Sequence, residues 1–224
     1  MYFDFIILYP SPRRKWGFAI GISIFLPCPN FAALAAQEPV MRILINDSKT
    51  FRFRADGSIP LLVRGIGYRE KRLSTLNLKL KNGRMHWAMG PEQNRWISLP
   101  SYRKISIRSS DPRGIWLGKR RYRGEVRIGV QEKRLIAVNH LGVERYVMSV
   151  VGSEMPKDWP KAALQAQAVA ARTYALKRLG KTGGFDINST ESSQVYLGIE
   201  SETKTTINAV NSTRSLVLRH KGKL

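Results

Sequence analysis

The sequence is poor in cysteine, histidine and acidic residues. Its 224 residues include one cysteine, three histidines and 16 aspartates and glutamates, against 38 lysines and arginines. A single cysteine excludes an intramolecular disulfide, and His86, His140 and His220 lack the spacing of metal ligands. We therefore expect no metal site and no cofactor, so any chemistry rests on acid, base and amide side chains.

The shortage of acids leaves a formal net charge of +22. Such an excess attracts polyanions, and nucleic acid, anionic membranes and anionic cell-wall polymers all qualify. Hydrophobic residues make up 43% of the chain, which is enough for a packed core and argues against global disorder. The length fits one domain of ordinary size, or one domain with a small additional lobe.

The N-terminal segment narrows the choice of polyanion. A basic cluster at residues 13–15 precedes an uncharged apolar run at residues 16–26, which has the length of a signal-peptide core rather than of a membrane span. Residues 33–35 read ALA, a cleavage pattern. We expect residues 1–35 to be a secretory signal, with an uncleaved anchor as the alternative. The protein would then be exported to the periplasm, cell wall or envelope, and it would have no nucleic-acid partner. Cys28 would be lost with the signal.

Residues 36–114 alternate apolar and polar side chains in short runs, which is typical of strands. Turn signals such as Asn82-Gly83 and Asp111-Pro112 separate these runs. A hairpin across residues 131–134 is expected to follow. The expected strands cover residues 41–45, 50–54, 74–80, 104–108, 122–128 and 135–139. The lysines and arginines that alternate with apolar residues would line a solvated sheet face, which either contacts a polyanion or only keeps the protein soluble.

Helical patterns replace the strands after His140. A short helix is expected at residues 142–151, and a second, alanine-rich helix at residues 159–179, with Asp158 as its N-cap and Gly180 near its end. Alanine allows close packing, so this second helix is expected to be central and buried. Residues 216–218 resemble the start of a strand. Together these patterns predict an α+β fold.

Glu154 is the candidate for acid/base chemistry. It lies at the boundary between the two expected helices, in the apolar company of Val150, Val151, Met155 and Trp159. A carboxyl group in such surroundings can hold its proton near neutral pH and donate it to a substrate. The alternative is an ordinary surface or capping carboxylate.

Three further side chains are candidates for substrate binding. Arg172 lies among the alanines of the second helix, where it either pairs with a buried acid or faces a cleft near Glu154. Gln194 and Tyr196 carry groups suited to sugar binding through hydrogen bonds and ring stacking, with an ordinary strand and turn as the alternative. The sequence contains no phosphate-binding loop, dinucleotide fingerprint or Gly-x-Ser-x-Gly elbow.

Several motifs taken together resemble the SpoIID/LytB domain family. They are residues 122–124 (YRG), 138–139 (VN), 141–147 (LGVERYV), 151–156 (VGSEMP), 159–160 (WP), 163–175 (ALQAQAVAARTYA) and 194–198 (QVYLG). On this resemblance, residues 115–224 are identified as a SpoIID/LytB domain with a central alanine-rich helix, preceded by a strand-rich basic region at residues 36–114. The family domain continues beyond the position of Leu224, so the C-terminal part of the domain is expected to be missing.

The resemblance implies work on the cell wall. SpoIID-type members are lytic transglycosylases that cleave peptidoglycan glycan strands, which makes Glu154 the expected single acid/base and places Arg172 near the same cleft. LytB-type members are amidase enhancers, which bind the wall and stimulate an N-acetylmuramoyl-L-alanine amidase. Some members hold zinc near the QVYLG block, but residues 190–193 read TESS here, so no zinc is expected. A basic exported nucleic-acid binder remains a third interpretation, and it would show steep salt dependence in DNA binding.

Overall fold

The computed structural model describes residues 37–90, 95–100, 103–181 and 183–224, together with the backbone of residues 4–7. Apart from those four residues, the predicted secretory signal at residues 1–35 lies outside the described part of the chain. The four residues form strand β1 (Asp4–Ile7), which pairs antiparallel with β15 (Leu216–Arg219) near the end of the chain.

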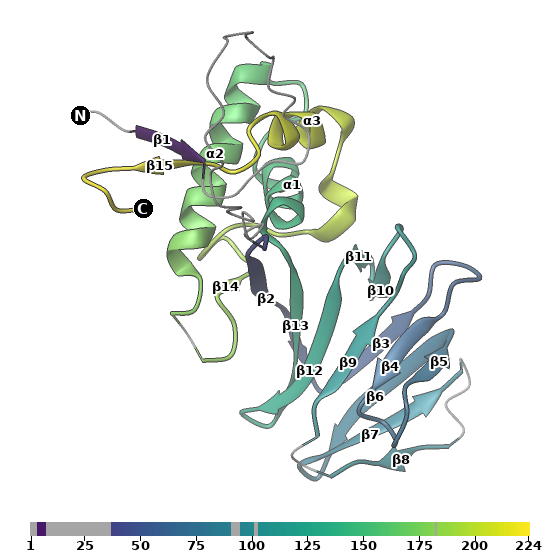
Figure 1. Cartoon of the computed structure of the whole chain (residues 1–224). Helices are drawn as coiled ribbons and strands as arrows, with labels where there is room; N and C mark the ends of the chain where they lie inside the picture. Colours follow the sequence, from purple (N-terminus) through teal and green to yellow (C-terminus); the bar gives the residue numbers. More distant parts are fainter. Residues whose placement is uncertain (1–3, 8–36, 91–94, 101–102, 182) are drawn as a thin grey trace, which may run out of the picture.

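The helices gather at one end of the molecule and most strands of the two larger sheets lie toward the other, so the fold is α+β as predicted (Figure 1). The helices are α1 (Val143–Glu154), α2 (Lys161–Arg178) and α3 (Lys204–Ser212), with a 3₁₀ turn η1 (Gly198–Ser201). The remaining strands are β2 (Val40–Ser48), β3 (Thr50–Arg54), β4 (Leu61–Arg64), β5 (Lys71–Leu73), β6 (Thr75–Lys81), β7 (Arg84–Met89), β8 (Ile97–Ser98), β9 (Ile105–Arg108), β10 (Ile115–Leu117), β11 (Arg120–Tyr122), β12 (Glu125–Gln131), β13 (Arg134–Gly142) and β14 (Ile187–Asn188).

Most strands belong to two larger sheets. One has the order β11-β10-β3-β6-β7-β8, and the other has the order β14-β2-β13-β12-β9-β4-β5. Strand β3 pairs with β10, and β2 pairs along its length with β13. Main-chain hydrogen bonds therefore cross the predicted boundary between residues 36–114 and 115–224 in both sheets. The two regions predicted from the sequence thus contribute strands to the same two sheets.

Alternation along the strands fixes which side chains enter the core. In β3, Phe51 and Phe53 are buried while Arg52 and Arg54 are exposed, and the two phenylalanines pair in register with buried leucines of β6. Buried apolar residues of both sheets join those of α1 and α2 in one core cluster. The predicted solvated basic face is the exposed side of this pattern.

Two hairpin turns use left-handed backbone conformations. Asn82 (φ 51°) and Gly83 (φ 71°) connect β6 to β7, as the Asn-Gly signal predicts. Glu132 (φ 49°) and Lys133 (φ 60°) connect β12 to β13, with Gln131 opposite Arg134. The predicted hairpin across residues 131–134 is therefore confirmed, although its turn contains no glycine.

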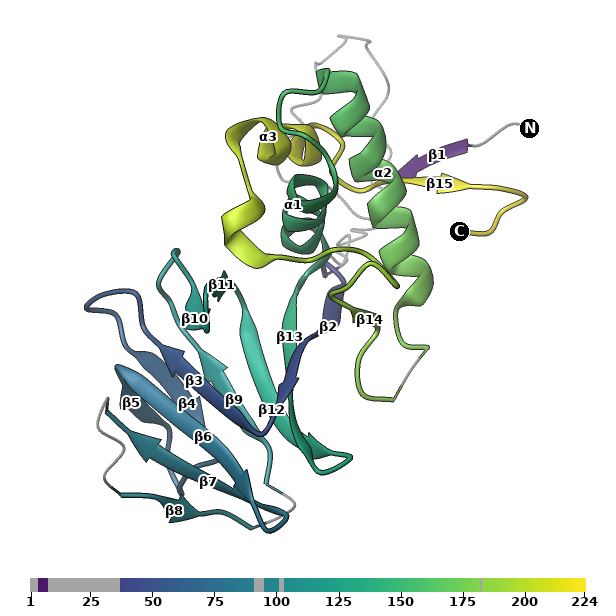
Figure 2. The ribbon, with the colours of Figure 1, turned by 180° about the vertical axis from the view of Figure 1, so that it is seen from behind.

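The alanine-rich helix α2 packs against α1, α3 and β15 (Figure 2). Its predicted N-cap is wrong, because Pro160 occupies that position and no side chain caps the helix. A proline has no N–H to leave unsatisfied, and its fixed φ suits a helix start. Gly180 follows the helix with φ 74°, which agrees with the predicted stop.

Gly152 marks a close approach between α1 and η1. A Cβ atom built there would overlap the backbone carbonyl oxygen of Ser201, and the Ser149 and Ser201 hydroxyls meet beside it at 3.2 Å. We expect Gly152→Ala to lower the free energy of unfolding by about 1–3 kcal/mol, in spite of the better helix propensity of alanine. Urea unfolding measures this loss. Gly129→Ala is the control, because its Cβ would meet a neighbour at an ordinary 3.8 Å, and equal losses in both variants would contradict the expectation.

Candidate functional site

Glu154 is the last residue of α1 and is half-buried. Its two carboxyl oxygens accept hydrogen bonds from different elements. The Gln167 side chain on α2 donates Nε2–H to Oε2 at 2.7 Å, and the backbone N–H of Val195 donates to Oε1 at 3.1 Å. The carboxyl group is thus held in one orientation between α2 and the segment that follows β14.

The surroundings of Glu154 favour its protonated form. Burial raises the pKa of the Glu154 carboxyl above its ordinary value, and the hydrogen bonds from Val195 and Gln167 offset part of this rise. The carboxyl group also lies at the negative end of the α1 dipole, with no basic residue in the last turn of that helix. The direction of this pKa shift is the one that the sequence-based argument requires of a proton donor.

The raised pKa of Glu154 predicts a pH-dependent stability. The folded protein binds this proton more tightly than the unfolded chain does, so the stabilisation is complete below the unfolded-state pKa and is lost as pH rises through the folded-state pKa. Glu154→Gln removes the titration and keeps the shape. The melting temperature of this variant, relative to wild type, is therefore expected to rise between about pH 4 and pH 8. The exposed Glu191→Gln variant is the control, and a pH-independent difference for Glu154→Gln would contradict the shift.

Arg172 is a core residue in this structure. Its guanidinium donates from Nε and Nη2 to the two carboxylate oxygens of Glu144 at 2.9 and 2.8 Å, and both side chains are almost fully covered. A further N–H reaches the carbonyl oxygen of Leu216 at 2.9 Å. Arg172 therefore forms a buried ion pair, which is one of the two alternatives given in the sequence analysis. In this conformation the guanidinium does not face a cleft, and a role of Arg172 in substrate binding stays a prediction.

Gln194 and Tyr196 are buried as well, with 6% and 1% of their surface exposed. The Tyr146 hydroxyl donates to Gln194 Oε1 at 3.0 Å, and the Tyr196 hydroxyl donates to Asn139 Oδ1 at 2.7 Å. The rings of Tyr146 and Tyr196 lie 5.4 Å apart. In this conformation both predicted substrate-binding side chains instead support the segment whose Val195 N–H contacts Glu154.

The sequence reasoning missed three groups at or behind the site. Gln167 and the Val195 N–H orient the Glu154 carboxyl, and Glu144 neutralises Arg172. A polar amide within an alanine-rich helix is a signal that could have singled out Gln167, and an acid within the apolar LGVERYV run could have singled out Glu144. The role of a backbone N–H leaves no trace in the sequence.

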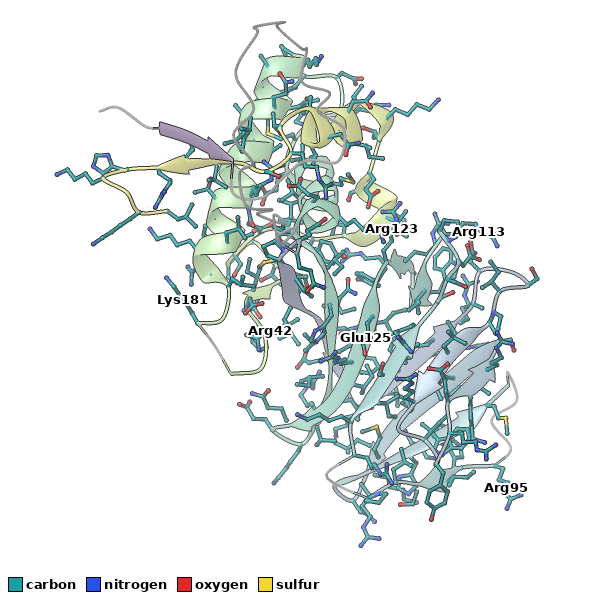
Figure 3. The ribbon with its side chains drawn as sticks, viewed as in Figure 1. Arg42, Arg95, Arg113, Arg123, Glu125 and Lys181 are labelled. Carbon is teal, nitrogen blue, oxygen red and sulfur yellow. The ribbon has the colours of Figure 1, made fainter. Side chains whose placement is uncertain are left out.

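Two cavities lie near the helices. One of about 540 Å³ lies between the start of α2 and α3, and it presents Trp159, which is 50% exposed, with Lys161, Asn208 and Asn211. Another of about 660 Å³ lies beside the first residues of α1, and its lining includes Arg123 (Figure 3). Neither lining includes Glu154. The first cavity combines an aromatic surface with amide groups, which is a suitable combination for a polar ligand with an apolar face.

The part of the chain that the structure describes contains no group of three or more histidine, cysteine, aspartate and glutamate side chains that could hold a metal ion. Among the same residues, no helix has both the length and the apolar character needed to span a bilayer. The absence of a metal and of a cofactor remains a prediction from the sequence.

These observations define an α+β protein in which Glu154 is a half-buried carboxyl group at the end of α1. Residues 131–220 match the SpoIID family, described as "Stage II sporulation protein". The chain therefore contains a SpoIID-family domain, as the motifs predicted, and the matched stretch lies within the predicted range of residues 115–224. It includes β13, all three helices and β15.

Three relatives overlap with this part of the chain to different extents. An uncharacterized protein of Brachyspira hyodysenteriae is 40% identical over 114 residues, which is 50% of this chain and 31% of that protein. The "Amidase enhancer" of Bacillus subtilis is 40% identical over 75 residues, covering 34% of this chain and 10% of the relative. "Stage II sporulation protein D" of Bacillus subtilis is 30% identical over 101 residues, covering 38% of this chain and 29% of that relative. The chain thus spans less than a third of the length of each, and no solved structure matches it significantly.

Proposed function

We propose that this protein acts on the cell wall and cleaves peptidoglycan glycan strands by lytic transglycosylation, with Glu154 as the single acid/base. The observation that carries the proposal is the Glu154 carboxyl, which is half-buried, held by two hydrogen bonds and raised in pKa. Membership of this domain in the SpoIID family, and the similarity to an amidase enhancer, support a role at the wall.

The reaction begins with protonated Glu154 as the general acid. It donates its proton to the glycosidic oxygen between N-acetylmuramic acid and N-acetylglucosamine, and the bond from that oxygen to the muramyl C1 breaks. The N-acetylglucosamine side leaves as an alcohol, and an oxocarbenium-like centre remains at C1. A raised pKa suits this step, because more of the Glu154 population carries the required proton near neutral pH.

Glu154 then acts as the general base. The muramyl 6-hydroxyl oxygen attacks C1 while its proton passes to the Glu154 carboxylate, which closes a 1,6-anhydro ring and restores the protonated acid. No water is consumed, so the reaction does not need the paired carboxylates of a glycoside hydrolase. The hydrogen-bond partners of Glu154 among the described residues agree with this requirement, since they are an amide and a backbone N–H.

The second candidate function is that of an amidase enhancer, which binds the wall and stimulates an N-acetylmuramoyl-L-alanine amidase. Two observations favour it. One relative carries that name, and the three side chains predicted to bind substrate are enclosed in the core, namely Arg172, Gln194 and Tyr196. On this interpretation the domain would use an exposed surface, such as that around Trp159, to hold the wall.

Purified glycan strands distinguish the two functions. Incubation of the protein alone with strands that lack stem peptides is expected to release soluble glycan fragments. A parallel incubation uses intact peptidoglycan with and without a wall amidase, and it follows the release of stem peptides. If the protein releases no glycan fragments and only accelerates the amidase, the transglycosylase proposal is wrong and the enhancer proposal holds.

A further inference from the structure

The exposed face of the six-stranded sheet contains a recess that is separate from Glu154. Its volume is about 390 Å³, and its lining comes from β3, β6 and the residue before β8. The lining residues are Thr50, Phe51, Arg52, Asn77, Leu78, Lys79 and Trp96. The sheet that carries it can be followed in Figure 2.

Asn77 is the unusual member of this lining. Its side chain is 2% exposed, and its Nδ2–H donates to the carbonyl oxygen of Gly90 at 2.8 Å. That bond fixes which side of the amide carries the oxygen. Oδ1 is buried and has no hydrogen-bond partner. A buried acceptor without a partner costs free energy, so this oxygen indicates a place where a ligand supplies a donor such as a hydroxyl group.

Two cations flank the recess, and both lack an acidic partner among the described residues. Arg52 is opposite Asn77 in the strand register, and Lys79 is opposite Thr50. The ion pairs of the described residues engage ten other arginines, namely Arg42, Arg64, Arg108, Arg113, Arg121, Arg123, Arg127, Arg134, Arg172 and Arg214. None of these ion pairs involves Arg52 or Lys79, so within the described part of the chain their charges are available to an external anion.

The same face holds further positive charge at a cost in stability. Lys81 lies directly opposite Arg84 in the register of β6 and β7, and like charges in that position repel each other. The Lys79 ammonium lies 3.8 Å from the ring centre of Trp96, which places an aromatic surface next to the cation. Exposed Arg95 adjoins Trp96 on this lobe (Figure 3). An anionic ligand would relieve this repulsion.

We propose that the recess binds a hydroxylated unit that carries one phosphate or carboxylate group, such as a repeating unit of an anionic envelope polymer. The anion contacts Arg52 and Lys79, a hydroxyl group donates to Asn77 Oδ1, and the carbon skeleton lies against the Trp96 ring. This binding site is independent of the acid/base role of Glu154.

Small ligands that differ by one group test the three contacts. Titration calorimetry with the full chain compares glycerol 1-phosphate and glucuronate, which have both an anion and hydroxyl groups, with glycerol and with ethyl phosphate. We expect at least one of the first two to bind, with a phosphate or carboxylate preference that identifies the kind of polymer. Ethyl phosphate should bind roughly five- to tenfold more weakly than glycerol 1-phosphate, since it lacks the donor for Asn77. Measurable and equal binding of the two phosphates, or no binding of either hydroxylated anion, would overturn the proposal.

Charge-neutral variants locate the binding site. Arg52→Gln and Lys79→Gln are each expected to weaken binding of the preferred ligand at least threefold. Arg72→Gln is the matched control, because Arg72 is an exposed strand arginine of β5 in the other sheet, and it should leave the affinity unchanged. Thermal melting of each variant confirms that it is folded. If Arg72→Gln weakens binding as much as Arg52→Gln, attraction to the overall charge explains the binding and the recess does not.

Discussion

Glu154→Gln is expected to lower the rate of glycan cleavage by about 10²–10⁴-fold, the usual contribution of a positioned general acid or base. The loss is large because one carboxyl group performs both proton transfers, so no second group retains either step. Glutamine has the same shape and can still accept the hydrogen bond from Val195 N–H. The variant should therefore remain folded, and its defect should appear in kcat rather than in binding to the wall.

Two controls make this prediction specific. Glu191→Gln changes an exposed acid and should retain wild-type activity. Gln167→Leu removes a group that orients the Glu154 carboxyl, so it should give an intermediate loss of kcat with a displaced pH profile. Wild-type activity in Glu154→Gln would exclude Glu154 as the acid/base, whatever the other two variants show.

Arg172→Met is expected to lower the free energy of unfolding by about 3–5 kcal/mol, because it leaves the Glu144 carboxylate buried without its partner. The total free energy of unfolding of such domains is only about 5–15 kcal/mol, so this loss would leave a large fraction of the molecules unfolded if the wild type lies at the low end of that range. Chemical denaturation measures the loss. Because Arg172 supports the core, its substitution should lower stability more than it lowers the rate of glycan cleavage by the folded protein.

A double-mutant cycle separates the ion pair from simple loss of packing. Glu144→Leu alone should also destabilise the protein strongly, whereas the double variant Glu144→Leu/Arg172→Met should recover much of the loss, since no charge is left buried. The exposed pair of Arg134 and Asp47 is the control, and Arg134→Gln should cost at most about 1 kcal/mol. Additive losses in the buried cycle would contradict this account of Arg172.

Local patterns in the sequence predicted part of the fold, namely α1, α2 and strands such as β3, β6 and β9, but not β4, β7, β10 or α3. Alternation predicted β3 to the residue, and Asn82-Gly83 predicted the turn that follows β6. Pairings between distant strands were not predictable, because alternation shows which face is buried and not which strand lies beside it. The pairing of β2 with β13, which joins the two regions separated in the sequence, is of this kind.

The site was predictable to the same limited extent. The apolar neighbours of Glu154 indicated a carboxyl group with a raised pKa, and the structure agrees in direction. The partner of Arg172 lies 28 residues away on another helix, and no local pattern could choose between that partner and a cleft. The role of the QVYLG block could not be predicted from its side chains, because its contact with Glu154 is made by the backbone N–H of Val195.

The most direct test of the central claim is mass spectrometry of the glycan ends that the protein releases from strands without stem peptides. The account predicts 1,6-anhydromuramyl ends from the wild-type protein and none above background from Glu154→Gln. Ordinary reducing ends from the wild type would show hydrolysis instead. That result, or anhydro ends formed equally by Glu154→Gln, would contradict a single-carboxylate transglycosylase.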